Sequence, residues 1–166
     1  MAIAAQKIMP CLWFDDQAED AAKFYCSIFK ESRIETITRY GKEGHEIHGR
    51  PEGSVMVVVF DIEGQRFVGL NGGPLFKFTE AISFQVHCKD QQEVDYYWSR
   101  LTAEGGQEGP CGWLKDKFGL SWQVVPTALI DMLMDKDPAK VARVTKAYLH
   151  VKKFDIEALR CAFDGK

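Results

Sequence analysis

The order of hydrophobic and polar positions repeats once along the chain. In each half, short apolar or alternating runs typical of strands surround one stretch with helical spacing. In the first half the pattern predicts a strand at 7–14, a helix at 15–30 and strands at 33–41, 54–64 and 65–73. In the second half it predicts a strand at 81–88, a helix at 89–106 and a hairpin at 109–126. Because both halves pass from a strand into a helix in the same way, we infer a duplicated β-α-β-β-β module.

Local signals predict where the helices begin and end. Asp16 is expected to cap the first helix, and Gly105 and Gly106 are expected to close the second. Beyond Pro126 we expect further helices, at 128–134, 137–151 and 154–163, the second of them with Asp137 as N-cap and Pro138 at its first position. We therefore predict a single domain over 1–166, with modules at about 7–74 and 81–126 and a helical extension at about 127–163.

Composition and charge exclude several classes of partner. The chain has 166 residues and a formal net charge of -3, and its basic residues are scattered, which argues against a nucleic acid or an anionic membrane as partner. The longest apolar run, Val55 to Phe60, is too short to span a membrane. Five widely spaced cysteines without a CxxC motif are typical of free thiols in a reducing compartment. We therefore expect a soluble, cytoplasmic protein.

Several motifs together resemble one known family. The segments "LWFDDQAEDAAKFYCSIF", "LNGGP", "ISFQV" and "GWLKDKFG" are similar to those of the PhnB-like (3-demethylubiquinone-9 3-methyltransferase-like) branch of the glyoxalase/bleomycin resistance/vicinal oxygen chelate superfamily. The resemblance spans about residues 8–163. It implies an α+β fold, in which two βαβββ modules form a cup-shaped mixed sheet with helices outside, here followed by C-terminal helices.

Strand alternation then predicts which side chains face the helices and which face the cup. The residues expected to face the helices are Leu12, Phe14, Phe84, Val86, Leu120, Trp122 and Val124. The residues expected to face the cup are Met9, Cys11, Trp13, Ser83, Gln85, His87, Ser121, Gln123 and Val125.

The resemblance also implies where a metal ion would bind. Metal-using members of the superfamily carry His or Glu near the middle of four strands, and those positions correspond here to Met9, Asn71, Ala81 or Ser83, and Gln123. A divalent cation acting as a Lewis acid needs about three ligands with charge or a good nitrogen donor, and neutral amides with a thioether hold it poorly. We therefore predict no metal and no cofactor, with Gln123 in the place of a metal-binding Glu.

Other chemical candidates each have a simpler interpretation. His45 and His48 lie in a glycine-rich segment and lack the spacing of a helical zinc site, so we expect a solvated loop there. Cys11 and Cys111 are potential nucleophiles with His87 as base, but inert cysteines are the ordinary case. The glycines of "LNGGP" lead into another strand and not into a helix, so we expect a turn between the modules and not a phosphate loop.

Two classes of function remain open. In the first, the protein binds a small molecule through Trp13, Asn71, Gln85, His87, Trp113 and Gln123. In the second, it is a metal-independent or weakly metal-dependent lyase, isomerase or methyltransferase that acts on a small oxygenated or aromatic substrate; its catalytic residues are unknown. No "GxGxxG" follows a first strand, so the residues do not support the methyltransferase. We also expect a homodimer, because the C-terminal helices carry an apolar face formed by Val141, Val144, Tyr148 and Val151.

Overall fold

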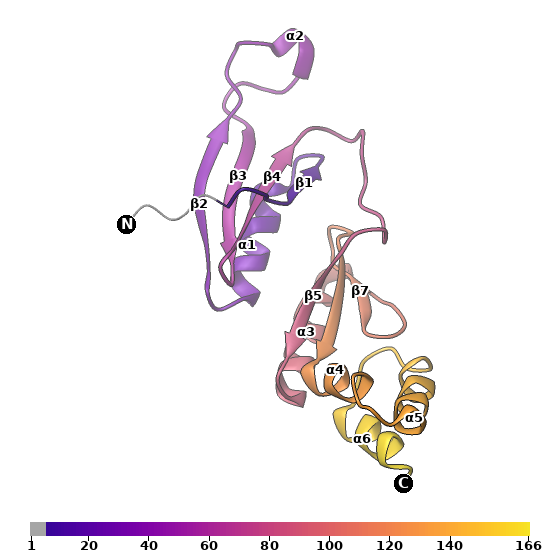
Figure 1. Cartoon of the computed structure of the whole chain (residues 1–166). Coiled ribbons are helices and arrows are strands. Elements are labelled where there is room, and N and C mark those ends of the chain that lie inside the picture. The colour runs from indigo at the N-terminus through magenta and orange to yellow at the C-terminus, as the bar shows by residue number, and fades with distance from the viewer. Residues whose placement is uncertain (1–5) are drawn as a thin grey trace. The chain divides into compact units, whose positions relative to one another are not determined.

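The computed structural model describes residues 6–166 of the chain (Figure 1). These residues form two compact units, which divide between Lys77 and Phe78. Each unit contains one four-stranded sheet and the helices that pack on it. Within the described residues, no helix has both the length and the apolar character needed to cross a bilayer.

Unit 1 contains one β-α-β-β-β module. Its elements are β1 (Cys11–Phe14), α1 (Ala18–Ile28), β2 (Ser32–Arg39), the one-turn helix α2 (His45–His48), β3 (Val55–Ile62) and β4 (Gln65–Asn71). The strand order is β1-β4-β3-β2, with β1 parallel to β4 and the other pairs antiparallel. The β3–β4 turn places Glu63 and Gly64 at positive φ, as a tight two-residue hairpin turn requires.

The predicted alternation in unit 1 is confirmed by burial. Leu12 and Phe14 are buried under α1, and Tyr25 of that helix stacks on Phe60 of β3 with 6.0 Å between ring centroids. β1 begins at Cys11, later than expected, and Met9 lies outside it. The segment of the two histidines is the helix α2 and not a loop, although it is exposed.

The predicted N-cap of the first helix is wrong. Helix α1 begins at Ala18, and the residue at its N-cap position is Gln17, whose side chain makes no capping hydrogen bond. The backbone N–H of Ala18 instead donates to Oδ1 of Asn71, at 2.8 Å. Asn71 comes from the end of β4, so a residue distant in sequence caps the helix in place of Asp16.

Unit 2 repeats the module and continues into further helices. Its elements are β5 (Ser83–Cys88), α3 (Gln91–Leu101), the 3-10 turn η1 (Ala103–Gly105), β6 (Gln107–Glu108), β7 (Trp113–Lys115), β8 (Ser121–Pro126), α4 (Thr127–Leu133), α5 (Pro138–Tyr148) and α6 (Ile156–Asp164). The strand order β5-β8-β7-β6 repeats that of unit 1, and β5 is parallel to β8. This repeated topology agrees with the inferred duplication.

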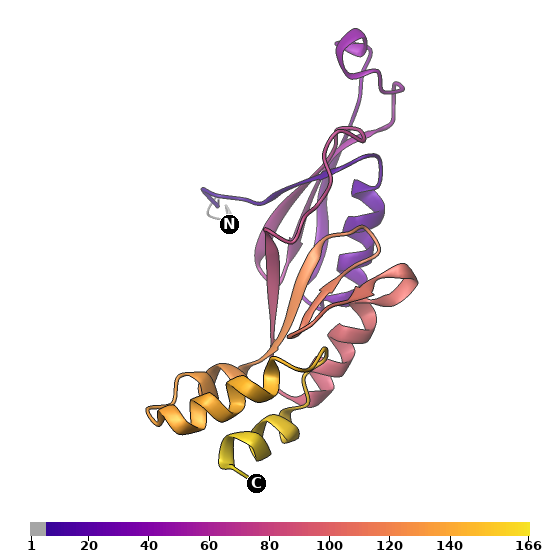
Figure 2. The ribbon, with the colours of Figure 1, turned by 90° about the vertical axis from the view of Figure 1, so that its right-hand side faces the viewer.

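Helix α3 covers one face of the unit 2 sheet (Figure 2). Its buried residues include Val94 and Trp98, which lie on the same side as the buried Trp122 and Val124 of β8. The helix ends at Leu101, earlier than expected, because Glu104 adopts a left-handed conformation and the chain then forms the short strand β6.

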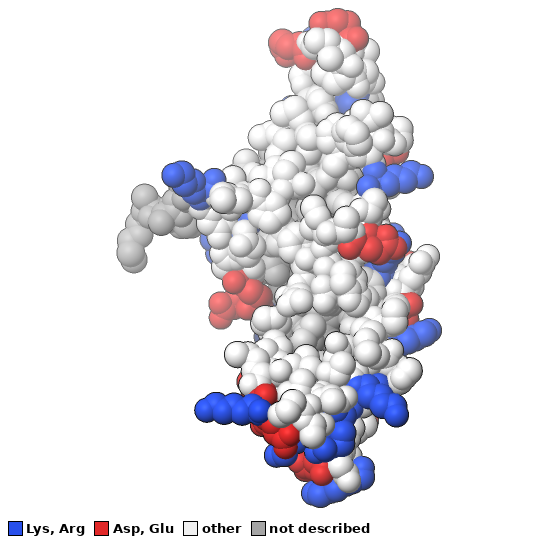
Figure 3. Space-filling model, turned by 45° about the vertical axis from the view of Figure 1, so that its right-hand side comes forward, with Lys and Arg blue, Asp and Glu red and all other residues white. Residues whose placement is uncertain are grey.

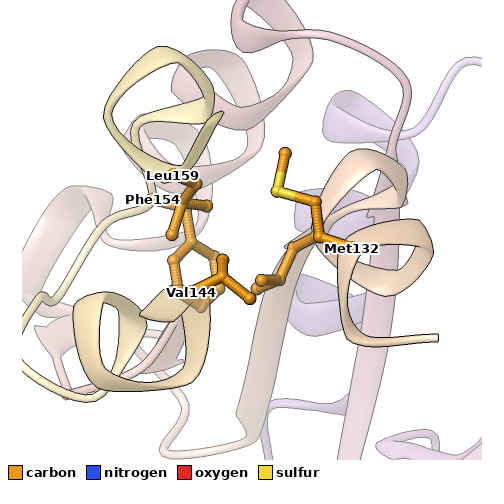
Figure 4. Close-up of a cluster of buried hydrophobic side chains, with 5 residues drawn as sticks. Met132, Val144, Phe154 and Leu159 are labelled. Atoms are coloured by element: carbon orange, nitrogen blue, oxygen red, sulfur yellow. The ribbon is translucent and has the colours of Figure 1, made fainter. Parts of the chain in front are cut away.

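The C-terminal helices have a hydrophobic cluster of their own (Figure 4). It consists of Leu129, Met132, Val144, Phe154 and Leu159. Asp137 caps α5 and Pro138 occupies its first turn, as the sequence predicts. Charged residues of both signs lie side by side on the exposed surface of these helices (Figure 3).

The apolar face expected to need a partner subunit is covered only in part within the chain, because Val151 stays 37% exposed. Val144 is fully buried in the cluster, and Tyr148 packs against it. The expectation of an exposed face is therefore wrong for these residues, because α4 and α6 supply the cover. The homodimer stays a prediction.

Candidate ligand site on the sheet of unit 2

Polar side chains gather on the face of the unit 2 sheet that α3 does not cover. In the register of the strands, Ser121 pairs with Ser83 and Lys115, and Gln123 pairs with Gln85 and Trp113. Because cross-strand partners point to the same side of a sheet, these side chains share one face.

Hydrogen bonds link the amides of this face into a chain. Nε2 of Gln123 donates to Oγ of Ser83 at 2.8 Å, and Oε1 of Gln123 accepts from Nε2 of Gln85 at 3.2 Å. Nε2 of His87 lies within hydrogen-bonding distance of Oε1 of Gln85, at 3.2 Å. Gln85 and His87 are exposed and Gln123 is half-buried, so a molecule lying on the strands can reach this chain.

A pocket of about 420 Å³ opens beside these amides. Its lining residues are Glu80, Gln107, Glu108, Gly109, Pro110, Trp113, Leu114, Lys115 and Ser121. Lys115 and Glu80 form an ion pair in its wall, and the hydrogen bond from Lys115 lowers the pKa of the Glu80 carboxyl below its ordinary value. Trp113 and Pro110 supply apolar surface next to that pair.

The pocket wall contains a buried hydroxyl without a partner. Ser121 is 1% exposed, and its Oγ has no hydrogen-bond partner among residues 6–166. Buried polar groups are nearly always paired, because an unpaired one costs about 1–3 kcal/mol. The oxygen itself has almost no accessible surface, so this hydroxyl lies behind the pocket surface and is not a direct contact for a ligand.

Two of the predicted ligand residues, Trp13 and Asn71, belong to unit 1. Nε1 of Trp13 donates to the carbonyl of Gly73 at 2.8 Å, and its ring meets Phe76 edge-on at 4.9 Å. A Cβ at Gly72 would lie 2.2 Å from the indole, so the "LNGGP" segment forms a turn packed closely against this ring. Trp13 is half-buried and keeps part of its surface open.

Asn71 is a structural residue in this geometry. It is 4% exposed; its Oδ1 accepts from Ala18 N and its Nδ2 donates to the carbonyl of Val55 at 3.1 Å. Both ends of the amide are therefore used by the backbone. The other four predicted residues, Gln85, His87, Trp113 and Gln123, lie together on the face described above; their role in binding stays a prediction.

Two residues predicted at the superfamily's metal positions, Asn71 and Gln123, already have hydrogen-bond partners. Asn71 is occupied by the backbone, and Gln123 is held between Ser83 and Gln85. Between residues 6 and 166, no three His, Cys, Asp or Glu side chains come together in a way that could hold a metal ion. Nδ1 of His48, one of the two histidines of α2, accepts a hydrogen bond from the backbone N–H of Arg50.

Burial acts on the thiols of two cysteines, Cys88 and Cys26. Cys88 is buried, and desolvation raises the pKa of its thiol to about 12. Desolvation also raises the pKa of Cys26. A raised pKa keeps the thiol protonated at neutral pH, which is the opposite of what a nucleophile needs.

Sequence reasoning missed Lys115, Glu80 and Gln107 as pocket residues. Lys115 lies two positions after Trp113 on the same strand, so alternation alone places both on one face. Alternation also places Ser121 on that face, but nothing in the sequence indicates that its hydroxyl lacks a hydrogen-bond partner within the described chain. Glu80 precedes β5, and only the folded chain brings it to Lys115.

Comparisons with known proteins identify the family. The family model described as 3-demethylubiquinone-9 3-methyltransferase matches residues 6–125. A putative 3-demethylubiquinone-9 3-methyltransferase, PhnB protein, from Bacillus cereus shares 34% identity over 73% of this chain and 99% of its own, with a TM-score of 0.63.

More distant solved structures share the fold. A protein from Pseudomonas aeruginosa has 17% identity over 74% of this chain and 98% of its own, with a TM-score of 0.58. The fosfomycin resistance protein FosX from Listeria monocytogenes has 16% identity over 75% of this chain and 94% of its own, with a TM-score of 0.50. No curated protein matches the chain. The chain belongs to the PhnB-like, 3-demethylubiquinone-9 3-methyltransferase family, with the glyoxalase/bleomycin resistance fold.

Proposed function

We propose that the protein binds a small organic molecule in the pocket on the sheet of unit 2. The observation that carries this proposal is a pocket of about 420 Å³ whose wall places Trp113 and Pro110 next to the ion pair of Lys115 and Glu80. Small-molecule sites combine apolar walls with a few placed polar groups, and this pocket has both.

The lining residues indicate the chemistry of the ligand. Trp113 and Pro110 offer flat apolar surface, which suits an aromatic or amphipathic molecule. Polar contacts come from the pair of Lys115 and Glu80 in the wall and from the exposed amide of Gln85 on a neighbouring strand. The ammonium of Lys115 is paired with Glu80, but it has three N–H donors, so an anionic group of a ligand can share it with that carboxylate.

Binding is better supported than catalysis on this face. A general base needs an ionisable group with a matched pKa within reach of the substrate. The ionisable groups on this face include His87, which is exposed and hydrogen-bonded to Gln85, and Lys115, which is paired with Glu80. The methyltransferase in the family's description is therefore not carried over to this chain, and the protein is proposed to bind its ligand without a metal.

Replacement of Trp113 with alanine is expected to weaken binding of an aromatic probe. We choose anilinonaphthalene sulfonate, followed by its fluorescence, because it combines aromatic rings with a polar acceptor. Loss of the indole surface should cost about 1–3 kcal/mol, which is a weakening of about 5- to 150-fold. The control is Tyr96→Ala, which removes an exposed aromatic of α3 outside the pocket. Equal weakening in both variants, or no binding by the wild-type protein, would contradict the proposal.

Purified protein without a histidine tag is expected to carry no stoichiometric transition metal. The physical reason is that the positions corresponding to the superfamily's ligands supply amides whose atoms are already hydrogen-bonded. Elemental analysis by mass spectrometry measures zinc, nickel and iron directly. Close to one equivalent of any of them, lost together with the fold on chelation, would contradict the prediction and would mean that side chains at other positions bind the metal.

A further inference from the structure

The C-terminal extension contacts the wall of the pocket. The family model ends at residue 125, so α4, α5 and α6 lie beyond the part of the chain that it describes. The segment at 149–154, which joins α5 to α6 and is called the strap below, runs beside the turn at 109–113, called the rim turn. Three residues of the rim turn, Gly109, Pro110 and Trp113, line the pocket.

Two backbone hydrogen bonds join the strap to the rim turn. The N–H of Cys111 donates to the carbonyl of Val151 and the N–H of Gly112 donates to the carbonyl of Lys152, both at 2.7 Å. The ring of Phe154 closes the contact: a Cβ at Gly112 would lie 2.4 Å from its Cε2. The strap therefore binds the turn by its backbone and packs against it without room for a side chain.

The rim turn needs such support because its backbone is strained. Cys111 has a φ of 56° and Gly112 a φ of 79°, both in the left-handed region. Glycine adopts this conformation freely, but a cysteine there is disfavoured and persists when its surroundings hold it. The two bonds from the strap hold the peptide groups on both sides of Cys111.

The strap is itself fixed to α3. Nε2 of Gln91 donates to the carbonyl of Phe154 at 3.1 Å, and the N–H of Ile156 donates to Oε1 of the same glutamine at 2.9 Å. Lys153 pairs with Asp95 one turn further along the helix, at 2.6 Å. One amide of α3 thus spans the end of the strap and the start of α6.

A third contact reaches the pocket wall directly. Nζ of Lys152 lies 3.6 Å from Oε2 of Glu108, while Oε1 of Glu108 accepts from Nε1 of Trp98. Glu108 lines the pocket beside the rim turn. The strap therefore bonds directly to Glu108, Cys111 and Gly112, and it acts on Trp113 through the turn that these bonds hold.

We propose that the C-terminal extension is a positioning element, whose strap fixes the rim turn and thereby the place of Trp113 in the pocket. Its effect on ligand affinity rests on the function proposed above, whereas its effect on the rim turn does not. The extension then has a role at the site, although it lies outside the segment that the family model describes.

The test compares Gln91→Ala with Gln92→Ala in the full-length protein. Gln91→Ala removes both bonds to the end of the strap, while Gln92 is its exposed neighbour on α3 and serves as the matched control. Without probe, hydrogen exchange of the Cys111 and Gly112 amides should become at least about tenfold faster in Gln91→Ala only. Amides of the β5–β8 ladder report global stability and should keep their rates.

The probe titration separates the two proposals. In Gln91→Ala, anilinonaphthalene sulfonate should bind at least about threefold more weakly, and the Trp emission spectrum should shift, with neither change in Gln92→Ala. Unchanged exchange at Cys111 and Gly112, or equal acceleration of the β5–β8 amides, would overturn the positioning role. If the wild-type protein binds no probe, the proposed function fails, and the exchange rates still decide whether the strap holds the turn.

Discussion

Replacing Trp122 with alanine is expected to lower the free energy of unfolding by about 3–5 kcal/mol. Trp122 is 4% exposed, and its ring lies 5.6 Å from that of Phe84, between centroids. Truncation would remove the largest side chain of β8 from the core under α3. It would also take a hydrogen-bond donor from a buried carboxylate, because Nε1 of Trp122 donates to Oδ2 of Asp116 at 2.9 Å.

The carboxylate of Asp116 explains why a tryptophan, which has an indole N–H donor, suits position 122. Asp116 is 3% exposed, and its Oδ1 accepts from the backbone N–H groups of Phe118, at 2.9 Å, and Leu120, at 3.1 Å. The "KDKFG" turn between β7 and β8 is thus organised around one buried acid. Trp122→Phe keeps most of the ring volume and removes only the indole donor, so we expect a smaller loss of about 1–3 kcal/mol.

Chemical denaturation of both Trp122 variants and of Trp13→Ala measures these differences. Trp13 is the matched control, since it is a strand tryptophan that is half-buried and lies in the other unit. A greater loss of stability in Trp13→Ala than in Trp122→Ala would mean that the core-facing and open sides of the strands are interchanged.

The strand faces could be predicted because they depend on a local rule. Alternation placed Leu12, Trp122 and Val124 toward the helices and Gln85 and Gln123 on the other side, and the burial of these residues agrees. The rule needs only the direction of one buried side chain, since every second residue follows it. The same rule would also have placed Lys115 beside Trp113.

Contacts between distant segments could not be predicted in this way. Asp16 carries the usual signal of an N-cap, but Asn71, far along the chain, satisfies the first N–H of α1. The apolar spacing of α5 predicts a buried stripe without stating what covers it, and the cover turned out to be α4 and α6. Likewise, the strap meets the rim turn through backbone groups, which every residue carries and which leave no pattern in the sequence.

Asn71→Ala is expected to destabilise the protein by about 2–4 kcal/mol, because it leaves two backbone groups without partners. The N–H of Ala18 would lose its acceptor and the carbonyl of Val55 its donor, in a site where Asn71 is 4% exposed. Asn71→Asp keeps the acceptor for Ala18 but places a carboxylate oxygen against the carbonyl of Val55 in a buried site, so it should also destabilise the protein. Gln123→Ala is the matched control: its amide bonds only to side chains on a face that water reaches, and we expect a loss below about 1 kcal/mol. Urea denaturation gives the three values, and hydrogen exchange at the Ala18 amide locates the effect. If Gln123→Ala proved as costly as Asn71→Ala, the division between a structural amide in unit 1 and a ligand-facing amide in unit 2 would not hold.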